Sequence, residues 1–200
     1  MGFKVGQKVS YPNHGVCAIE AVESKKVSDG SVDFYTLRVL AFNSLILVPM
    51  NNAESIGIRP VISNDQSQKV LSFLSKDFDE IESDWKIRIR DFLATVQTGE
   101  IFAVADVLKK LTFLTRLKTL SFREQRLLEK TKFLVTCELA TACSKPMEEI
   151  GTKVDKFVAK ACALPDTINT PAIITDRITC NRATVELSTL PNNFLDNSTI

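Results

Sequence analysis

The amino-acid sequence predicts an α+β protein of two domains, a small antiparallel β-barrel followed by a compact all-α domain of about five helices. Three observations carry this prediction. In residues 3–61, apolar side chains recur at every second position, which is typical of strands. Clusters of turn-forming residues separate these alternating runs. From residue 63 onward, apolar side chains instead recur every three or four positions, which is typical of helices.

The alternating runs of residues 3–61 define the expected strands. Among the turns between them, Asp29-Gly30 is the clearest hairpin signal, because glycine tolerates the positive φ that a tight turn requires. A last strand is expected at Ile56–Arg59. About five strands in about sixty residues is the size of an SH3-like or Tudor-like barrel, which exposes less edge than an open sheet. The runs are Val9 and Tyr11, then Cys17, Ile19 and Ala21, then Tyr35, Leu37 and Val39.

The first two helices are expected on either side of an acidic linker, residues 76–82. Ser63-Asn64-Asp65 provides a good cap for the first helix. For the second helix, Ser83 is the expected cap and Gly99 the expected end. The apolar stripe of this second helix consists of Trp85, Ile89, Phe92, Leu93 and Val96.

Three further helices and a tail complete the expected organisation. The third helix is predicted at Ile101–Leu114, the fourth opens at the capping box of Ser121 and Glu124, and Pro146 suits the first turn of the fifth. Prolines then interrupt a stretch rich in Thr, Asn and Ser, so we expect residues 165–200 to be flexible or loosely packed. The expected domains are residues 1–62 and 63–164, followed by this tail.

The composition is that of an ordinary soluble protein, with 200 residues, a hydrophobic fraction of 44% and a net charge of +1. No apolar run approaches the ~20 residues that cross a bilayer, and the N-terminus does not resemble a signal peptide, so we expect a cytoplasmic protein without membrane contact. The five cysteines include no pair at C-x-x-C spacing. Neither a disulfide framework nor a metal site is therefore expected.

The residues of catalytic sites are also sparse. The one histidine, His14, lies in a predicted turn and has no nucleophile signature near it. Neither of the glycine-rich motifs that bind phosphates is present. The carboxylates of residues 77–84 are read as a solvated linker. We therefore expect no catalytic residue, no cofactor and no enzymatic activity.

The positive charge is concentrated in the helical part. Residues 85–133 contain eleven basic and five acidic residues. Trp85, the sole tryptophan, stands at a helix start beside Lys86, Arg88 and Arg90. Its spacing favours a core or interdomain anchor, because the indole continues the apolar stripe. The alternative is a contact residue at an exposed helix end, with the neighbouring bases binding phosphates, as in proteins that wedge side chains into the DNA minor groove.

An ordered set of motifs resembles the CarD/CdnL family of bacterial transcription regulators. The resemblance covers residues 1 to about 160. Its motifs are Tyr11-Pro12-x-His14-Gly15, Phe34-Tyr35-x-Leu37-Arg38-Val39, Ile46-Leu47-Val48-Pro49, Trp85-x-x-Arg88-x-Arg90 and Leu120-Ser121-Phe122-x-Glu124.

The resemblance implies a non-enzymatic factor with an N-terminal Tudor-like domain, similar to the RNA polymerase-interacting domain of the transcription-repair coupling factor. This domain is expected to dock on the polymerase β subunit, largely through an exposed strand edge. The expected contacts are Lys25, Thr36, Leu47 and Pro49, and Leu47 makes the contact near it hydrophobic.

For the helical domain, the resemblance implies contact with promoter DNA at the upstream edge of the transcription bubble, in the minor groove and with little sequence specificity. The wedge would be Trp85 and the phosphate contacts Lys86, Arg88 and Arg90, so that the open complex is stabilised. Ile87 and Ile89 replace a base and a tyrosine of many members, which implies a weaker grip on DNA. We expect a nucleoid-associated monomer; the alternative is a polymerase-binding adaptor whose helical domain contacts another protein.

Overall fold

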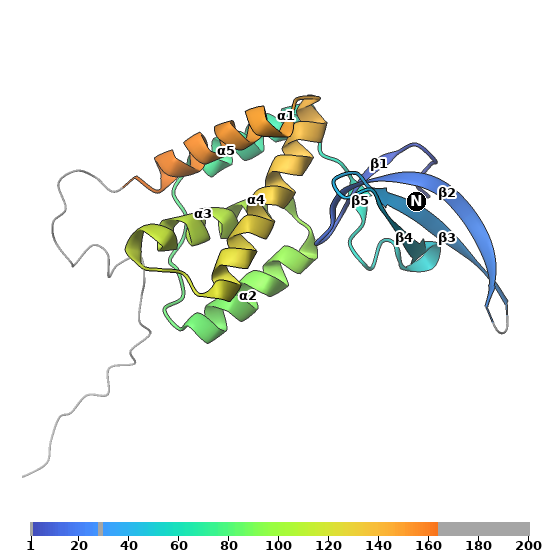
Figure 1. Ribbon diagram of the computed structural model, residues 1–200, viewed down its shortest axis with the longest axis horizontal. Coiled ribbons are helices and arrows are strands. Elements are labelled where there is room, and N and C mark those ends of the chain that lie inside the picture. The colour runs from blue at the N-terminus through green and yellow to red at the C-terminus, as the bar shows by residue number, and fades with distance from the viewer. Residues whose placement is uncertain (1, 28–29, 164–200) are drawn as a thin grey trace, which may run out of the picture.

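The computed structural model describes residues 2–27 and 30–163 of the chain. A five-stranded antiparallel sheet precedes five α-helices, so the predicted two-domain α+β class is confirmed. Figure 1 shows the sheet at one end of the molecule and the helices at the other. The prediction of a flexible or loosely packed segment at 165–200 falls outside the described residues.

The sheet contains β1 (Lys8–Tyr11), β2 (Gly15–Val27), β3 (Gly30–Val39), β4 (Ser44–Pro49) and β5 (Arg59–Pro60). Its hydrogen-bonded order is β4-β3-β2-β1-β5, so β4 and β5 stand at the two ends of the order. β2 and β3 pair as far as Val27 and Gly30, as a hairpin requires, and the two residues between them lie outside the described part. The alternation predicted most of this core, because Val9, Cys17, Ile19, Tyr35, Leu37 and Val39 are buried together and Tyr11 packs against them. Ala21 is not part of the core, because the register of β2 shifts between Ile19 and Ala21.

The predicted start of the last strand is wrong. β5 begins at Arg59, and the preceding residues form a turn in which the Gly57 N–H bonds the Glu54 carbonyl at 3.0 Å. Gly57 has a φ of 87°, which interrupts the extended backbone of a strand. A short 3-10 helix, η1 (Met50–Asn52), leads into this turn.

The helices are α1 (Asn64–Leu74), α2 (Trp85–Thr98), α3 (Ile101–Leu117), α4 (Phe122–Cys143) and α5 (Met147–Ala161). Capping boxes at Ser63 and Ser121 start α1 and α4, and Gly99 ends α2 with a φ of 72°. The cap of α2 is Asp84 rather than the predicted Ser83, because the Asp84 Oδ1 accepts the Lys86 N–H at 2.7 Å. No helix in residues 2–27 and 30–163 is long and apolar enough to span a membrane.

The two domains pack against each other through the end of α2 and the C-terminal half of α4. Figure 1 shows the C-terminal end of α2 beside the sheet and its N-terminal end directed away from it. At this seam Arg59 of β5 forms an ion pair with Glu138 of α4. The seam therefore fixes α2 at one end and leaves its start, with Trp85, at the far side of the helical domain.

Inside the helical domain, a buried lysine sets the path of the chain between α1 and α2. The Lys109 ammonium lies 3.3 Å from the carbonyls of Phe73 and Asp77 and 3.4 Å from that of Lys76. It also lies 3.8 Å from the centre of the Phe73 ring. Burial lowers the pKa of Lys109, although the Asp106 carboxylate 3.6 Å away opposes the shift. The positive charge satisfies the carbonyls at the end of α1, where the helix dipole is negative.

We expect Lys109→Met to lower the free energy of unfolding by about 2 kcal/mol, because the substitution leaves buried carbonyls without a donor. Urea denaturation followed by circular dichroism measures this change. Lys156→Met, on the exposed face of α5, is the matched control and should shift the stability by less than about 0.5 kcal/mol. Equal midpoints for the two variants would contradict the role assigned to Lys109.

Candidate interaction surfaces

Strand register brings the four residues expected to contact polymerase to one face of the sheet. Thr36 pairs with Leu47, and Pro49 lies two residues further along β4. Lys25 pairs with Val32, which has the same orientation along β3 as Thr36. The alternate residues of β3 and β4 point into the core. Lys25, Thr36, Leu47 and Pro49 therefore share the outer face of the sheet, although only the fold brings them together.

The most accessible part of this outer face is the strand β4. Leu47 is 47% exposed, and Leu45, two residues before it, is exposed as well. Within the part of the chain that the structure describes, β4 pairs with β3 alone, so the outer edge of β4 is open to a further strand. Proteins usually protect such an edge with charges or prolines. An apolar open edge is typical of a surface to which another chain adds a strand.

The other two residues of the face differ in accessibility. Lys25 is exposed and forms a 3.7 Å ion pair with Glu23. Thr36 is only 8% exposed, and its buried hydroxyl has no hydrogen-bond partner among the described residues. Thr36 thus offers little surface for direct contact, whereas Leu47, Pro49 and Lys25 remain candidate contacts.

A second candidate surface is the start of α2, residues 85–87, which we call the α2 tip. Trp85 is the first residue of the helix and is 51% exposed, so its interpretation as a core or interdomain anchor is wrong. The Lys86 ammonium lies 5.8 Å from the centre of the indole. Ile87 is exposed, whereas Ile89 is buried. In the predicted stripe, Ile89, Phe92 and Val96 are buried but Leu93 is exposed.

Arg88 requires a correction, because the structure places this expected phosphate contact in the interior. The residue is only 2% exposed, and its Nη2 lies 2.7 Å from the Glu124 Oε1. Its Nη1 donates to the carbonyls of Glu82 and Ser83, at 2.6 and 3.1 Å. With all these bonds made, its guanidinium has no access to a phosphate. Arg88 instead ties the turn before Trp85 to the start of α4.

The partner of Arg88, Glu124, is held in its ionised form. Burial raises the pKa of Glu124, but hydrogen bonds from Arg88 and from the backbone and hydroxyl of Ser121 outweigh burial. The pKa therefore lies below its ordinary value. The Glu124 carboxylate, which holds the α2 tip against α4 through Arg88, is consequently fully ionised at neutral pH.

The remaining expected contacts, Lys86 and Arg90, are exposed, and Arg90 forms a surface ion pair with Asp91 at 2.9 Å. Sequence reasoning missed Phe122, which is 70% exposed at the start of α4 with the Arg126 guanidinium 5.2 Å from its ring centre. The capping box at Ser121 makes Phe122 the first residue of α4, but that position alone does not signal exposure, because Ile101, the first residue of α3, is buried.

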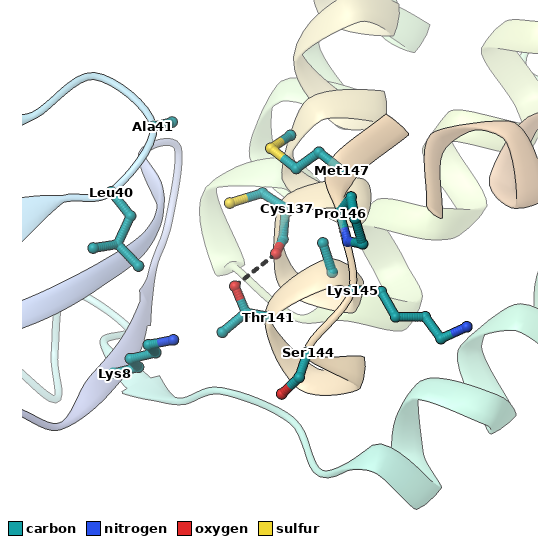
Figure 2. A pocket seen from close by; sticks show the side chains of 10 residues that line it. Lys8, Leu40, Ala41, Cys137, Thr141, Ser144, Lys145, Pro146 and Met147 are labelled. Atoms are coloured by element: carbon teal, nitrogen blue, oxygen red, sulfur yellow. Dashed lines mark hydrogen bonds between the residues drawn. The ribbon is translucent and has the colours of Figure 1, made fainter. Parts of the chain in front are cut away.

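A cleft of about 510 Å³ lies between the two domains. Figure 2 shows Lys8, Leu40 and Ala41 of the sheet domain facing Cys137, Thr141 and Met147 across it. No group of three or more His, Cys, Asp or Glu within residues 2–27 and 30–163 could hold a metal ion. Burial raises the pKa of Cys17 to about 12 and also raises that of Cys137, so these thiols stay protonated and unreactive.

Acidification should weaken the link between α2 and α4. Because the pKa of Glu124 is lower in the folded protein than in the unfolded chain, ionised Glu124 stabilises the fold above the unfolded value. This contribution is lost as the pH falls through the folded value. Between pH 7 and about pH 3, the urea midpoint of the wild type should therefore fall more than that of Glu124→Gln. The exposed Glu129→Gln should follow the wild type; parallel pH profiles for all three proteins would contradict the assignment.

Comparison with known proteins identifies the family to which the chain belongs. Residues 3–62 match the family model described as the CarD-like/TRCF RID domain, and residues 69–155 match the CarD C-terminal domain. The "Putative transcription factor YdeB" of Bacillus subtilis (strain 168) is 30% identical over 139 residues, which cover 67% of this chain and 88% of that protein. The solution NMR structure of the N-terminal domain of Myxococcus xanthus CarD is 34% identical, covers 29% of this chain and 77% of that one, and has a TM-score of 0.26. The chain therefore belongs to the CarD family, and it is a non-enzymatic, CarD-like transcription factor with an N-terminal RNA polymerase-interacting domain.

Proposed function

We propose that this protein binds the β subunit of RNA polymerase through its sheet and promoter DNA through its helical domain, at the upstream edge of the bubble. It acts as a nucleoid-associated monomer and stabilises the open complex. One observation carries the proposal: a half-exposed tryptophan projects from a braced helix start, beside the exposed bases Lys86 and Arg90.

Polymerase docking rests on the outer edge of β4. A strand of the partner that adds to this edge gains main-chain hydrogen bonds, while Leu45 and Leu47 supply apolar contact. Lys25 and Pro49, on the same face, extend the contact beyond β4. The β subunit is thereby recognised mainly by shape and apolar surface, with Lys25 as the one charged contact proposed.

The DNA contact is small and weak by itself. Because Arg88 is buried, only Lys86 and Arg90 remain as phosphate contacts near Trp85, and each such contact weakens with salt. Ile87 is exposed in place of a base, whereas the buried Ile89 leaves the DNA surface unchanged. Docking on polymerase raises the effective concentration of the α2 tip at the promoter, so a weak contact becomes useful.

The preference for open complexes follows from the cost of wedging an indole between bases. In intact duplex, such insertion costs a few kcal/mol of stacking energy. The cost is smaller at the edge of a bubble, where stacking is already disturbed. A ligand that binds one state more tightly shifts the equilibrium toward that state by the difference between its two binding free energies. Trp85 accordingly favours the open state without reading sequence.

A second candidate function is that of an adaptor whose helical domain contacts another protein. The exposed Ile87 and Leu93 favour it, because both present apolar surface on α2 beside the expected DNA contact. The two functions differ in what removal of the indole does to the open complex.

Trp85→Ala should leave polymerase binding unchanged and shorten the lifetime of the open complex roughly tenfold, in line with ~1–3 kcal/mol for stacking of a base on an aromatic ring. Lifetimes are measured by competitor challenge of polymerase–promoter complexes, after circular dichroism has verified the fold. Gln97→Ala, which truncates an exposed side chain of the same helix, is the control. A normal lifetime with Trp85→Ala would refute DNA wedging and leave the adaptor function.

Leu47→Asp should abolish co-purification with polymerase without unfolding the sheet, because it places a charge on an apolar docking edge. Leu93→Asp makes the same change on a similarly exposed leucine of the helical domain and should retain polymerase. Retention of polymerase by Leu47→Asp would show that docking uses another surface.

A further inference from the structure

The seam between the domains is built around one buried carboxylate. Glu138 of α4 forms a two-pronged ion pair with Arg59 of β5, with Nη1–Oε1 and Nη2–Oε2 distances of 2.5 and 2.9 Å. The Ser10 hydroxyl donates to the same carboxylate at 3.2 Å, and the Ile62 N–H at 3.4 Å. The carboxylate thus receives donors from β1, from β5 and from the linker that leads to α1. We call the Arg59–Glu138 pair the seam pair.

The same arginine also holds the end of α2. Its Nε and Nη2 donate to the carbonyl of Gly99 at 3.1 and 2.8 Å. Gly99 is the C-terminal cap of α2, where the carbonyls carry the negative end of the helix dipole. Arg59 therefore links the sheet to α2 and α4 at once.

Close packing leaves the end of α2 no room to shift at this point. A Cβ at Gly99 would lie 2.6 Å from the Cγ of Pro12, so only glycine allows this approach. A Cβ at Gly57 would lie 3.2 Å from the Thr98 carbonyl oxygen. The cavity beside Pro12 and Gly99 measures about 10 Å³, whereas the cleft of Figure 2 measures about 510 Å³. The domains are therefore closely packed at the seam pair, and a second contact joins them where the ring centres of Phe42 and Phe133 lie 5.5 Å apart.

We infer that the seam pair is a positioning element, which fixes the direction of α2 relative to the docking sheet and so determines where Trp85 meets the DNA. This inference rests on the proposed function. α2 has 14 residues and is roughly 20 Å long. A tilt of about 10° at its base would move Trp85 by roughly 3.5 Å, about the spacing of successive nucleotides along one strand. A small rotation of α2 at its seam end therefore produces a larger displacement at Trp85, as in a lever.

Two variants disturb the contact between the C-terminal end of α2 and the sheet in different ways. Glu138→Gln keeps the shape of the side chain but removes the charge that pairs with Arg59. Gly99→Ala keeps the charges but drives a methyl group into Pro12, and adding Pro12→Gly removes the atoms that it meets. Asp155→Asn breaks the exposed ion pair with Lys132, which lies wholly within the helical domain, and serves as the control.

Three measurements on the full-length variants test the inference. Residual dipolar couplings of backbone amides report whether the two domains share one orientation, polymerase pull-down reports docking, and competitor challenge gives the open-complex lifetime. We expect the same relative orientation of the two domains in the wild type and the control, and a changed or no longer fixed orientation in Glu138→Gln and Gly99→Ala. Polymerase should still be retained, while the lifetime falls at least threefold. Pro12→Gly should restore the lifetime of Gly99→Ala toward that of Pro12→Gly alone.

The outcomes separate this inference from the proposed function. An unchanged relative orientation of the domains in both variants, or a normal lifetime despite a changed one, overturns the positioning role while the effect of Trp85→Ala still stands. No effect of Trp85→Ala overturns the proposed function itself. If adding Pro12→Gly does not restore the lifetime of Gly99→Ala, the effect of Gly99→Ala comes from strain within α2. That outcome would overturn the positioning role.

Discussion

The Arg59 guanidinium makes the interaction on which the arrangement of the two domains depends. It bonds the Glu138 carboxylate of α4 and the Gly99 carbonyl of α2. At the other end of the same two helices, Arg88 bonds Glu124. Both glutamates belong to α4, so one helix holds α2 at its base and near its tip. A buried ion pair adds little stability over an apolar replacement, but removal of one partner costs about 3–5 kcal/mol. We interpret the two pairs as selecting one packing of α2.

Much of the fold could be predicted because its signals are local. The capping box at Ser121 and the positive φ of Gly99 each depend on a few neighbouring residues, and the structure contains both. The burial of Arg88 could not be predicted, because its partner Glu124 lies 36 positions away and an arginine on a helix usually faces water. For Trp85, helical spacing alone favoured burial, whereas the family resemblance implied the exposed position that the structure shows. Helical spacing cannot decide the burial of a first helical residue, because Ile101 at the start of α3 is buried whereas Trp85 at the start of α2 is half exposed.

The two candidate surfaces use different chemistry at opposite parts of the molecule. The edge of β4 is apolar and offers backbone hydrogen bonds, whereas the α2 tip combines an aromatic ring with the exposed base Lys86, and the exposed Arg90 follows it on the same helix. Strand register, not sequence proximity, unites the first surface, because Lys25 and Leu47 belong to different strands. The second surface is continuous in sequence but needs Arg88 beneath it to hold its shape.

The position of the sole tryptophan also gives the molecule a natural optical property. Because Trp85 is the only indole in the chain and is half exposed, tryptophan emission originates at one place, the start of α2. The two tyrosines lie elsewhere, and Tyr35 is buried in the sheet. A change in the wavelength or the quenching of that emission therefore reports the environment of Trp85 alone. The unlabelled chain thus contains its own fluorescent reporter at the α2 tip.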